Sequence, residues 1–115
     1  MKLSLVVGLT LALAAPATAV APARLLIGAK EFQLTLSRAA IKAGPAAIQL
    51  ANYGEDPHDL RLRRVGGTRV YAIGTVTPGD VGELDARLLP GTYRLWCSLA
   101  NHAALGMRTK LVVKR

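Results

Sequence analysis

Apolar and polar residues alternate in short runs along most of the chain after Arg24, and turn-forming residues separate these runs. Phe32, Leu34 and Leu36 alternate with polar neighbours, which predicts a strand with one apolar face. Similar runs predict an edge strand at 25–27 and further strands at 48–50, 60–65, 68–73 and 93–97. Many short strands with period-two patterning are typical of an all-β sandwich or barrel.

Glycine and proline mark where these strands should end. Gly44-Pro45 predicts a turn, and Pro78-Gly79-Asp80 and Leu89-Pro90-Gly91 predict loops. Gly66-Gly67 predicts a hairpin turn between 60–65 and 68–73. The best short helix candidate is Arg38–Ala43, which Gly44-Pro45 would stop. We therefore expect an all-β domain of seven to eight strands, with no repeat and no low-complexity tail.

The first 19 residues have the pattern of a secretory signal peptide. Lys2 precedes an apolar core from Leu3 to Ala15, and Ala17-Thr18-Ala19 offers a small-residue cleavage site. The alternative is an uncleaved membrane anchor, but Pro16 and Pro22 interrupt the run, whose core is shorter than the ~20 residues of a spanning helix. We expect residues 1–19 to be removed, leaving a domain at 20–115 that is exported to the periplasm or the extracellular space.

The chain is basic, with 15 Lys and Arg against 7 Asp and Glu and a net charge of +8. Without Lys2 the balance is 14 against 7, or +7. This excess favours anionic partners. Nucleic acid is not expected, because the chain reads as exported and only 4% of it is aromatic. An acidic protein surface is expected, with membrane contact only peripheral, and we expect a monomer.

Four arginines lie near the expected hairpin: Arg61, Arg63, Arg64 and Arg69. They could form a basic patch that steers docking to an acidic redox partner. They could equally form a solvated strand face that discourages edge pairing. Both interpretations stay open on the sequence alone.

Candidate chemistry is concentrated in one segment, Cys97-Ser-Leu-Ala-Asn-His102-Ala-Ala-Leu-Gly-Met107. A thiolate, an imidazole and a thioether are donors that together favour copper in a His₂Cys site with a weak axial Met. The chain has two histidines, so the second imidazole could come only from His58. Alone, each residue has an ordinary structural explanation: a hydrogen-bonded core histidine, a buried cysteine, a surface histidine and a core methionine.

Strand periodicity indicates where two of these side chains point. His58, Leu60 and Leu62 should share the core-facing side of one strand, with Asp59, Arg61 and Arg63 on the other. Cys97 shares the inward side of its strand with Tyr93 and Leu95 by the same argument. An exported, lone cysteine is either buried and inert or protected by something such as a metal.

Three elements together resemble the cupredoxins, the small type 1 (blue) copper proteins: Asn52-Tyr53-Gly54-Glu55-Asp56-Pro57-His58-Asp59-Leu60, Pro90-Gly91-Thr92-Tyr93, and Cys97-x₄-His102-x₄-Met107. The last spacing is most similar to that of rusticyanins and auracyanins. The resemblance implies a cupredoxin-like Greek-key β-sandwich that binds one copper ion. It also implies that His58, Cys97 and His102 are equatorial ligands and Met107 the axial ligand.

Two positions depart from the cupredoxin pattern. The residue after the first histidine is often an Asn that braces the two ligand-bearing segments, and here it is Asp59. Trp96, immediately before the cysteine, is bulky for its position. Both bear on a reduction potential, which hydrogen bonds around the ligands tune.

The resemblance implies a one-electron carrier between redox partner proteins, with electrons passing through the ring edge of His102. A copper enzyme is not expected, because multicopper centres need further histidines and a dinuclear centre needs a second cysteine. The alternative is a copper storage, delivery or resistance protein of the same fold. A metal-free interaction module is a third possibility.

Overall fold

The structure is a computed structural model that describes residues 2–13 and 20–115. Its regular elements are nine strands, and the described residues contain no helix. The all-β prediction is confirmed, with more strands than the seven to eight expected. The strands are β1 (Ala23–Lys30), β2 (Gln33–Leu36), β3 (Ala40–Lys42), β4 (Gly44–Asn52), β5 (His58–Arg64), β6 (Val70–Val76), β7 (Val81–Leu88), β8 (Gly91–Trp96) and β9 (Arg108–Lys114).

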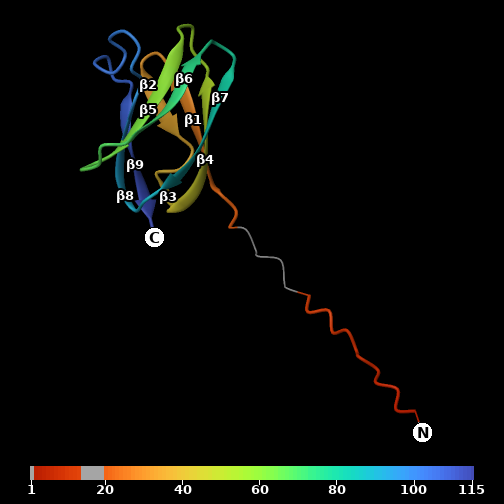
Figure 1. Ribbon diagram of the computed structural model, residues 1–115. Helices are drawn as coiled ribbons and strands as arrows, with labels where there is room; N and C mark the ends of the chain where they lie inside the picture. Colours follow the sequence, from red (N-terminus) through yellow and green to blue (C-terminus); the bar gives the residue numbers. More distant parts are fainter. Residues whose placement is uncertain (1, 14–19) are drawn as a thin grey trace.

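The strands form two sheets that face each other as a sandwich (Figure 1). One sheet has the order β2-β1-β4-β7 and the other the order β3-β9-β8-β5-β6. Two strand pairs, β1 with β4 and β3 with β9, are parallel, and the remaining pairs are antiparallel. The edge strand predicted at 25–27 is wrong, because β1 pairs with β2 on one side and β4 on the other.

Alternating apolar side chains fill the space between the sheets. Ile48 and Leu50 of β4 are buried in the same core as Leu60 and Leu62 of β5. Tyr93 of β8 is also buried, and its hydroxyl is hydrogen-bonded to both the backbone N–H and the carbonyl of Leu89 at 3.0 Å. Inward residues from both sheets thus provide the core that a sandwich requires.

The region 38–45 differs from its prediction. The candidate helix at Arg38–Ala43 is instead β3, which pairs in parallel with β9 and buries Ile41. Pairing with β9 satisfies the backbone there and buries a β-branched side chain, which outweighs a weak local helix preference. Gly44 is not part of a turn but opens β4, where its φ of +108° requires glycine.

The predicted hairpin connects β5 to β6, with a longer loop than Gly66-Gly67 alone. Residues 65–69 separate the two strands, and the Gly67 N–H donates to the Arg64 carbonyl at 2.9 Å. Gly66 takes a φ of +82° at this turn.

The four arginines near the hairpin do not share one environment. Arg64 donates to the Pro90 carbonyl at 2.9 Å, and Arg69 lies 4.6 Å from the centre of the Tyr71 ring.

Residues 2–13 lie outside the sandwich, are exposed and form neither strand nor helix (Figure 1). The expected cleavage site Ala17-Thr18-Ala19 lies outside the described residues. Within the described ranges no helix offers a stretch apolar and long enough to span a bilayer.

Candidate metal centre

His58, Cys97 and His102 meet at one end of the sandwich. Their donor atoms all lie within 4.8 Å of one another. The Nδ1 atom of His102 is 3.3 Å from Nδ1 of His58 and 3.5 Å from Sγ of Cys97. All three residues are buried, with exposed fractions of 0%, 1% and 8%.

Strand pairing explains how residues so far apart in the sequence come together. His58 is the first residue of β5, and Cys97 follows the last residue of β8. These strands are antiparallel neighbours in which Arg61 lies opposite Trp96. The start of β5 is therefore next to the end of β8, which brings His58 close to Cys97. His58 and Cys97 both face the core, as the periodicity predicts, and the structure shows that His58 reaches the loop after Cys97.

The loop between β8 and β9 is closed by its own backbone hydrogen bonds. The Cys97 N–H donates to the Met107 carbonyl, and the Met107 N–H donates to the His102 carbonyl, both at 3.0 Å. Gly106 has a φ of +125°, and a Cβ there would lie 2.8 Å from the Phe32 carbonyl oxygen. Met107 is fully buried in the core cluster that includes Cys97, while its role as axial ligand stays a prediction.

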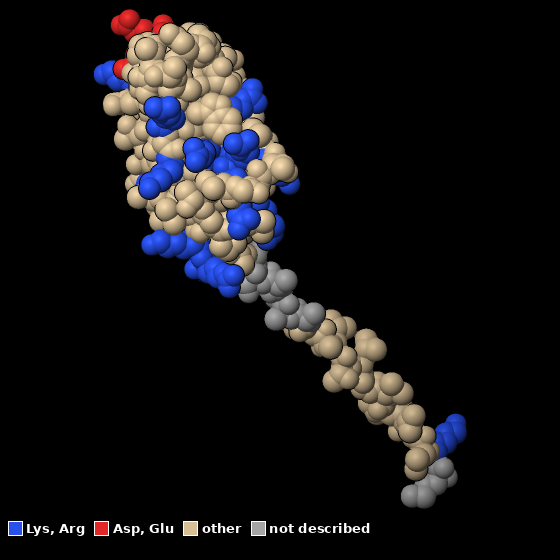
Figure 2. Space-filling model, turned by 90° about the vertical axis from the view of Figure 1, so that its left-hand side faces the viewer, with Lys and Arg blue, Asp and Glu red and all other residues tan. Residues whose placement is uncertain are grey.

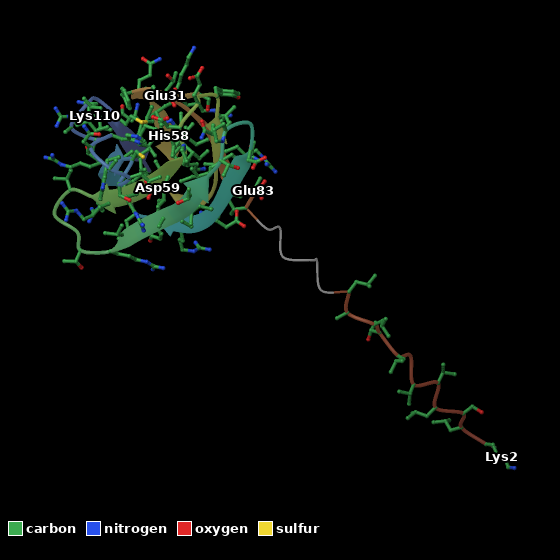
Figure 3. The ribbon with its side chains drawn as sticks, turned by 90° about the horizontal axis from the view of Figure 1, so that it is seen from above. Lys2, Glu31, His58, Asp59, Glu83 and Lys110 are labelled. Atoms are coloured by element: carbon green, nitrogen blue, oxygen red, sulfur yellow. The ribbon has the colours of Figure 1, made fainter. Side chains whose placement is uncertain are left out.

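Glu31, which sequence reasoning missed, contacts the buried histidine from the opposite sheet. It lies between β1 and β2, and its Oε1 is 3.1 Å from Nε2 of His58 (Figure 3). A carboxylate only accepts, so this contact requires a proton on Nε2, while Nδ1 is the ring atom that faces His102. Nothing in the sequence distinguishes Glu31 from other loop carboxylates.

The same carboxylate oxygen also fixes the segment before β5. It accepts hydrogen bonds from the backbone N–H groups of Asp56 at 2.6 Å and Glu55 at 2.8 Å. The Asp56 N–H is the largest of the causes that lower the pKa of Glu31 to about 2. A Cβ at Gly54 would lie 2.5 Å from the Glu31 carboxylate, so only glycine leaves room for this contact.

Asp59 joins the two segments that bear His58 and Cys97. Its Oδ1 accepts from the Ser98 N–H at 2.6 Å and its Oδ2 accepts from the Ser98 hydroxyl at 2.5 Å. The Asp59 N–H points at Sγ of Cys97 from 3.5 Å. Burial raises the pKa of the Cys97 thiol, which this N–H partly offsets. The aspartate therefore occupies the bracing position that the family pattern gives to Asn.

His102 is the member of the cluster closest to solvent. Its Nε2 lies 3.8 Å from Oδ2 of Asp56, and its ring centre is 5.3 Å from that of Phe32. The neighbouring Ala104 and Leu105 are exposed. One edge of this imidazole is thus the part of the centre that another molecule can approach most closely.

The donor set fits a first-row metal ion. Metal bonds of about 2.0–2.3 Å to imidazole nitrogen and thiolate sulfur place trigonal donors roughly 3.5–4 Å apart. The spacings of 3.3 and 3.5 Å are close to that range. The carboxylate on the second nitrogen of His58 is a common partner of metal-bound histidine.

No known family profile matches the sequence, and no curated protein matches it. Solved structures do match. Auracyanin A, a "blue" copper protein from Chloroflexus aurantiacus, has a TM-score of 0.66 at 18% identity, covering 82% of this chain and 100% of its own. An azurin from Methylomonas sp. strain J has 0.63 at 14% identity, covering 83% and 100%.

A purple cupredoxin from Nitrosopumilus maritimus also matches, with a TM-score of 0.57 at 19% identity over 80% of this chain and 99% of its own. The chain therefore has the cupredoxin fold, and the predicted fold class is confirmed. At such identities the likeness shows the fold, while the chemistry must be argued from the buried His-Cys-His cluster.

Proposed function

We propose that this chain binds one copper ion and carries single electrons between redox proteins. His58, Cys97 and His102 would be the equatorial ligands, with Met107 as the axial ligand. The observation that carries the proposal is the buried cluster of one thiol and two imidazole Nδ1 atoms. One thiolate with two imidazoles and a weak thioether is the donor set that selects a blue copper site.

The chain's own residues would keep the site geometry nearly constant while copper changes oxidation state. Glu31 holds the ring of His58, and Asp59 joins β5 to the residue after Cys97. Both contacts use atoms that do not face the centre. The ring edge of His102 would be the route for electrons, because it is the ligand nearest to solvent.

An electron carrier fits the chain better than an enzyme. The chain's two histidines and its one cysteine are all in this cluster, so none remains for a second copper centre. We further propose that residues 1–19 are a signal peptide and that residues 20–115 act in the periplasm or outside the cell as a monomer, exchanging electrons with an acidic partner. The mass of the product secreted by a bacterial host would show whether it begins at Val20.

The decisive experiment is the visible spectrum of residues 20–115 after addition of Cu(II). We expect an intense thiolate-to-copper band that Cys97→Ser abolishes. Ala104→Ser, at an exposed position of the same loop outside the cluster, is the control and should keep the band. A colourless protein with a reactive thiol would contradict the proposal.

Storage or delivery of copper is separated from electron transfer by two further measurements. A fast, reversible one-electron couple in voltammetry supports the carrier. Ready loss of copper to a competing chelator, without such a couple, supports storage, delivery or resistance.

A further inference from the structure

The charged residues in the strands of the five-stranded sheet are almost all cationic. These strands contain eight Lys and Arg residues but one acidic residue, Asp59, which is 2% exposed and hydrogen-bonded to Ser98. The three acids of the β7 region, Asp80, Glu83 and Asp85, lie in or beside the other sheet. Figure 2 faces the side where β8 and β9 lie in Figure 1, and shows Lys and Arg over that face with Asp and Glu only at one end.

Strand register places three of these cations side by side. Arg63 of β5 is opposite Arg94 of β8, and Arg94 is opposite Lys110 of β9. Residues directly opposite on adjacent strands have Cβ atoms only about 4.5–5.5 Å apart, and like charges there are destabilising. All three side chains are exposed, and none forms an ion pair with any residue in 2–13 or 20–115.

A second row lies next to the first, one step closer to the metal centre. Trp96 of β8 is flanked by Arg61 on β5 and Arg108 on β9. Arg61 has a partner, because its Nε is 3.6 Å from Asp59. Trp96 is half-buried, so an indole lies among the cations.

All the residues of the two rows except Arg61 line a shallow, open groove. Arg63, Arg94, Trp96 and Lys110 lie along it, Val65 of the β5–β6 loop borders it, and Ala103 of the Cys97–Met107 loop borders it as well. Trp96 and Ala103 are each adjacent in sequence to a residue of the His-Cys-His cluster. A molecule in the groove would therefore lie beside the candidate metal centre.

We propose that this groove is a docking site for an extended, carboxylate-rich segment of a partner protein. Side chains on one face of an extended segment repeat every ~6.8 Å, as do Arg108 and Lys110 along β9. Carboxylates at alternate positions can thus meet successive cations. Arginine forks pair with carboxylates in two parallel hydrogen bonds.

The spacing of the cations favours a protein segment over a membrane. Charges on a bilayer surface have no fixed spacing, whereas alternate side chains of an extended segment repeat at the spacing of the cations along β9. As a docking site for a redox partner the groove rests on the proposed function. As a binding site for an acidic segment it rests on charge and spacing, so it can be tested without copper.

The test uses the metal-free protein and a ten-residue peptide with Glu at every second position. Trp96 is the chain's one tryptophan, so its fluorescence reports binding in the groove directly. We expect Arg94→Glu/Lys110→Glu to weaken peptide binding about tenfold or more. The matched control, Arg38→Glu/Arg87→Glu, makes the same change in net charge at exposed positions outside the groove and should change affinity less than about threefold.

Three results would overturn the proposal. Equal weakening by both double variants would mean that net charge alone attracts the peptide. Absence of binding to the unaltered protein at low ionic strength would remove the site. The protein could also bind phosphatidylserine vesicles more tightly than the peptide and lose this binding in Arg94→Glu/Lys110→Glu. That result would make the groove a membrane-facing surface. Thermal unfolding of each variant checks that it folds, and loss of copper binding alone leaves the peptide result intact.

Discussion

The strand side and the loop side of the candidate metal centre are held in different ways. The strand side, His58 and Asp59 at the start of β5, is fixed by groups distant in the sequence: the Glu31 carboxylate and the N–H and hydroxyl of Ser98. The loop side, residues 97–107, is fixed largely by its own backbone hydrogen bonds and a glycine with positive φ. The first side therefore depends on tertiary structure, and the second mainly on local turns.

Removing the Asp59 carboxylate should give the largest loss of stability. Asp59→Ala leaves the Ser98 N–H and hydroxyl without their acceptor and Arg61 without its ion-pair partner. An unsatisfied donor costs about 1–3 kcal/mol, so we expect the free energy of unfolding to fall by about 2 kcal/mol. Chemical denaturation of the metal-free protein measures this change.

Asp59→Asn is the matched control, because an amide oxygen can still accept from the Ser98 N–H. It should lose less stability than the alanine variant. Equal losses in the two variants would show that the hydrogen bonds to Ser98 are not what joins the two segments.

Glu31→Ala tests the strand side at the histidine itself. Without the carboxylate the His58 ring loses the contact that fixes its orientation and proton position. Partners of this kind typically change metal affinity by 10–100-fold, and we expect a loss in that range in a copper competition assay. Glu31→Gln keeps a neutral acceptor and should retain part of the affinity.

Glu83→Ala is the control for a general loss of negative charge, because Glu83 lies on β7 and bonds to Gln49. It should leave copper affinity unchanged. If it weakens binding as much as Glu31→Ala does, the Glu31–His58 contact has no specific role.

Gly106→Ala tests the loop side. The side chain would be placed at a φ of +125° and within 2.8 Å of the Phe32 carbonyl oxygen. Such backbone strain costs of order 1–3 kcal/mol, so we expect about 1–2 kcal/mol less stability and faster release of copper. Gly74→Ala, which meets no atom within 4 Å, should be nearly neutral in the same thermal unfolding assay.

The smallest expected effect lies away from the centre, on the cationic face. Arg94→Thr removes the middle charge of the Arg63–Arg94–Lys110 row and supplies a residue with higher β propensity. We expect a gain of about 0.2–1 kcal/mol in the free energy of unfolding, reduced by added salt. A loss of stability at low salt would show that these charges do not repel one another.

Periodicity was sufficient to predict the all-β fold and the inward orientation of His58 and Cys97, because alternation depends only on the strand itself. It failed at β1 and β3, since both take part in parallel pairings with strands distant in sequence. The expectation that His58 can reach the loop is confirmed by the pairing of β5 with β8.

The contacts around the His-Cys-His cluster could not be predicted. Glu31 is 27 residues from His58. The two meet only because the β1–β2 loop of one sheet lies against the start of β5 in the other. The bracing by Asp59 was left open by the sequence because an aspartate can do this only if a donor faces it. Ser98 supplies two donors, which only the folded structure reveals.

The direction of two strands bears on how the protein could be attached to a surface. β1 runs toward the metal centre, ending just before Glu31, and β9 runs away from it, starting just after Met107. Ala23 and Lys114 therefore both lie at the end opposite the His-Cys-His cluster (Figure 1). A tag or linker joined at either position would hold the molecule upright on an electrode, with His102 turned toward the solution.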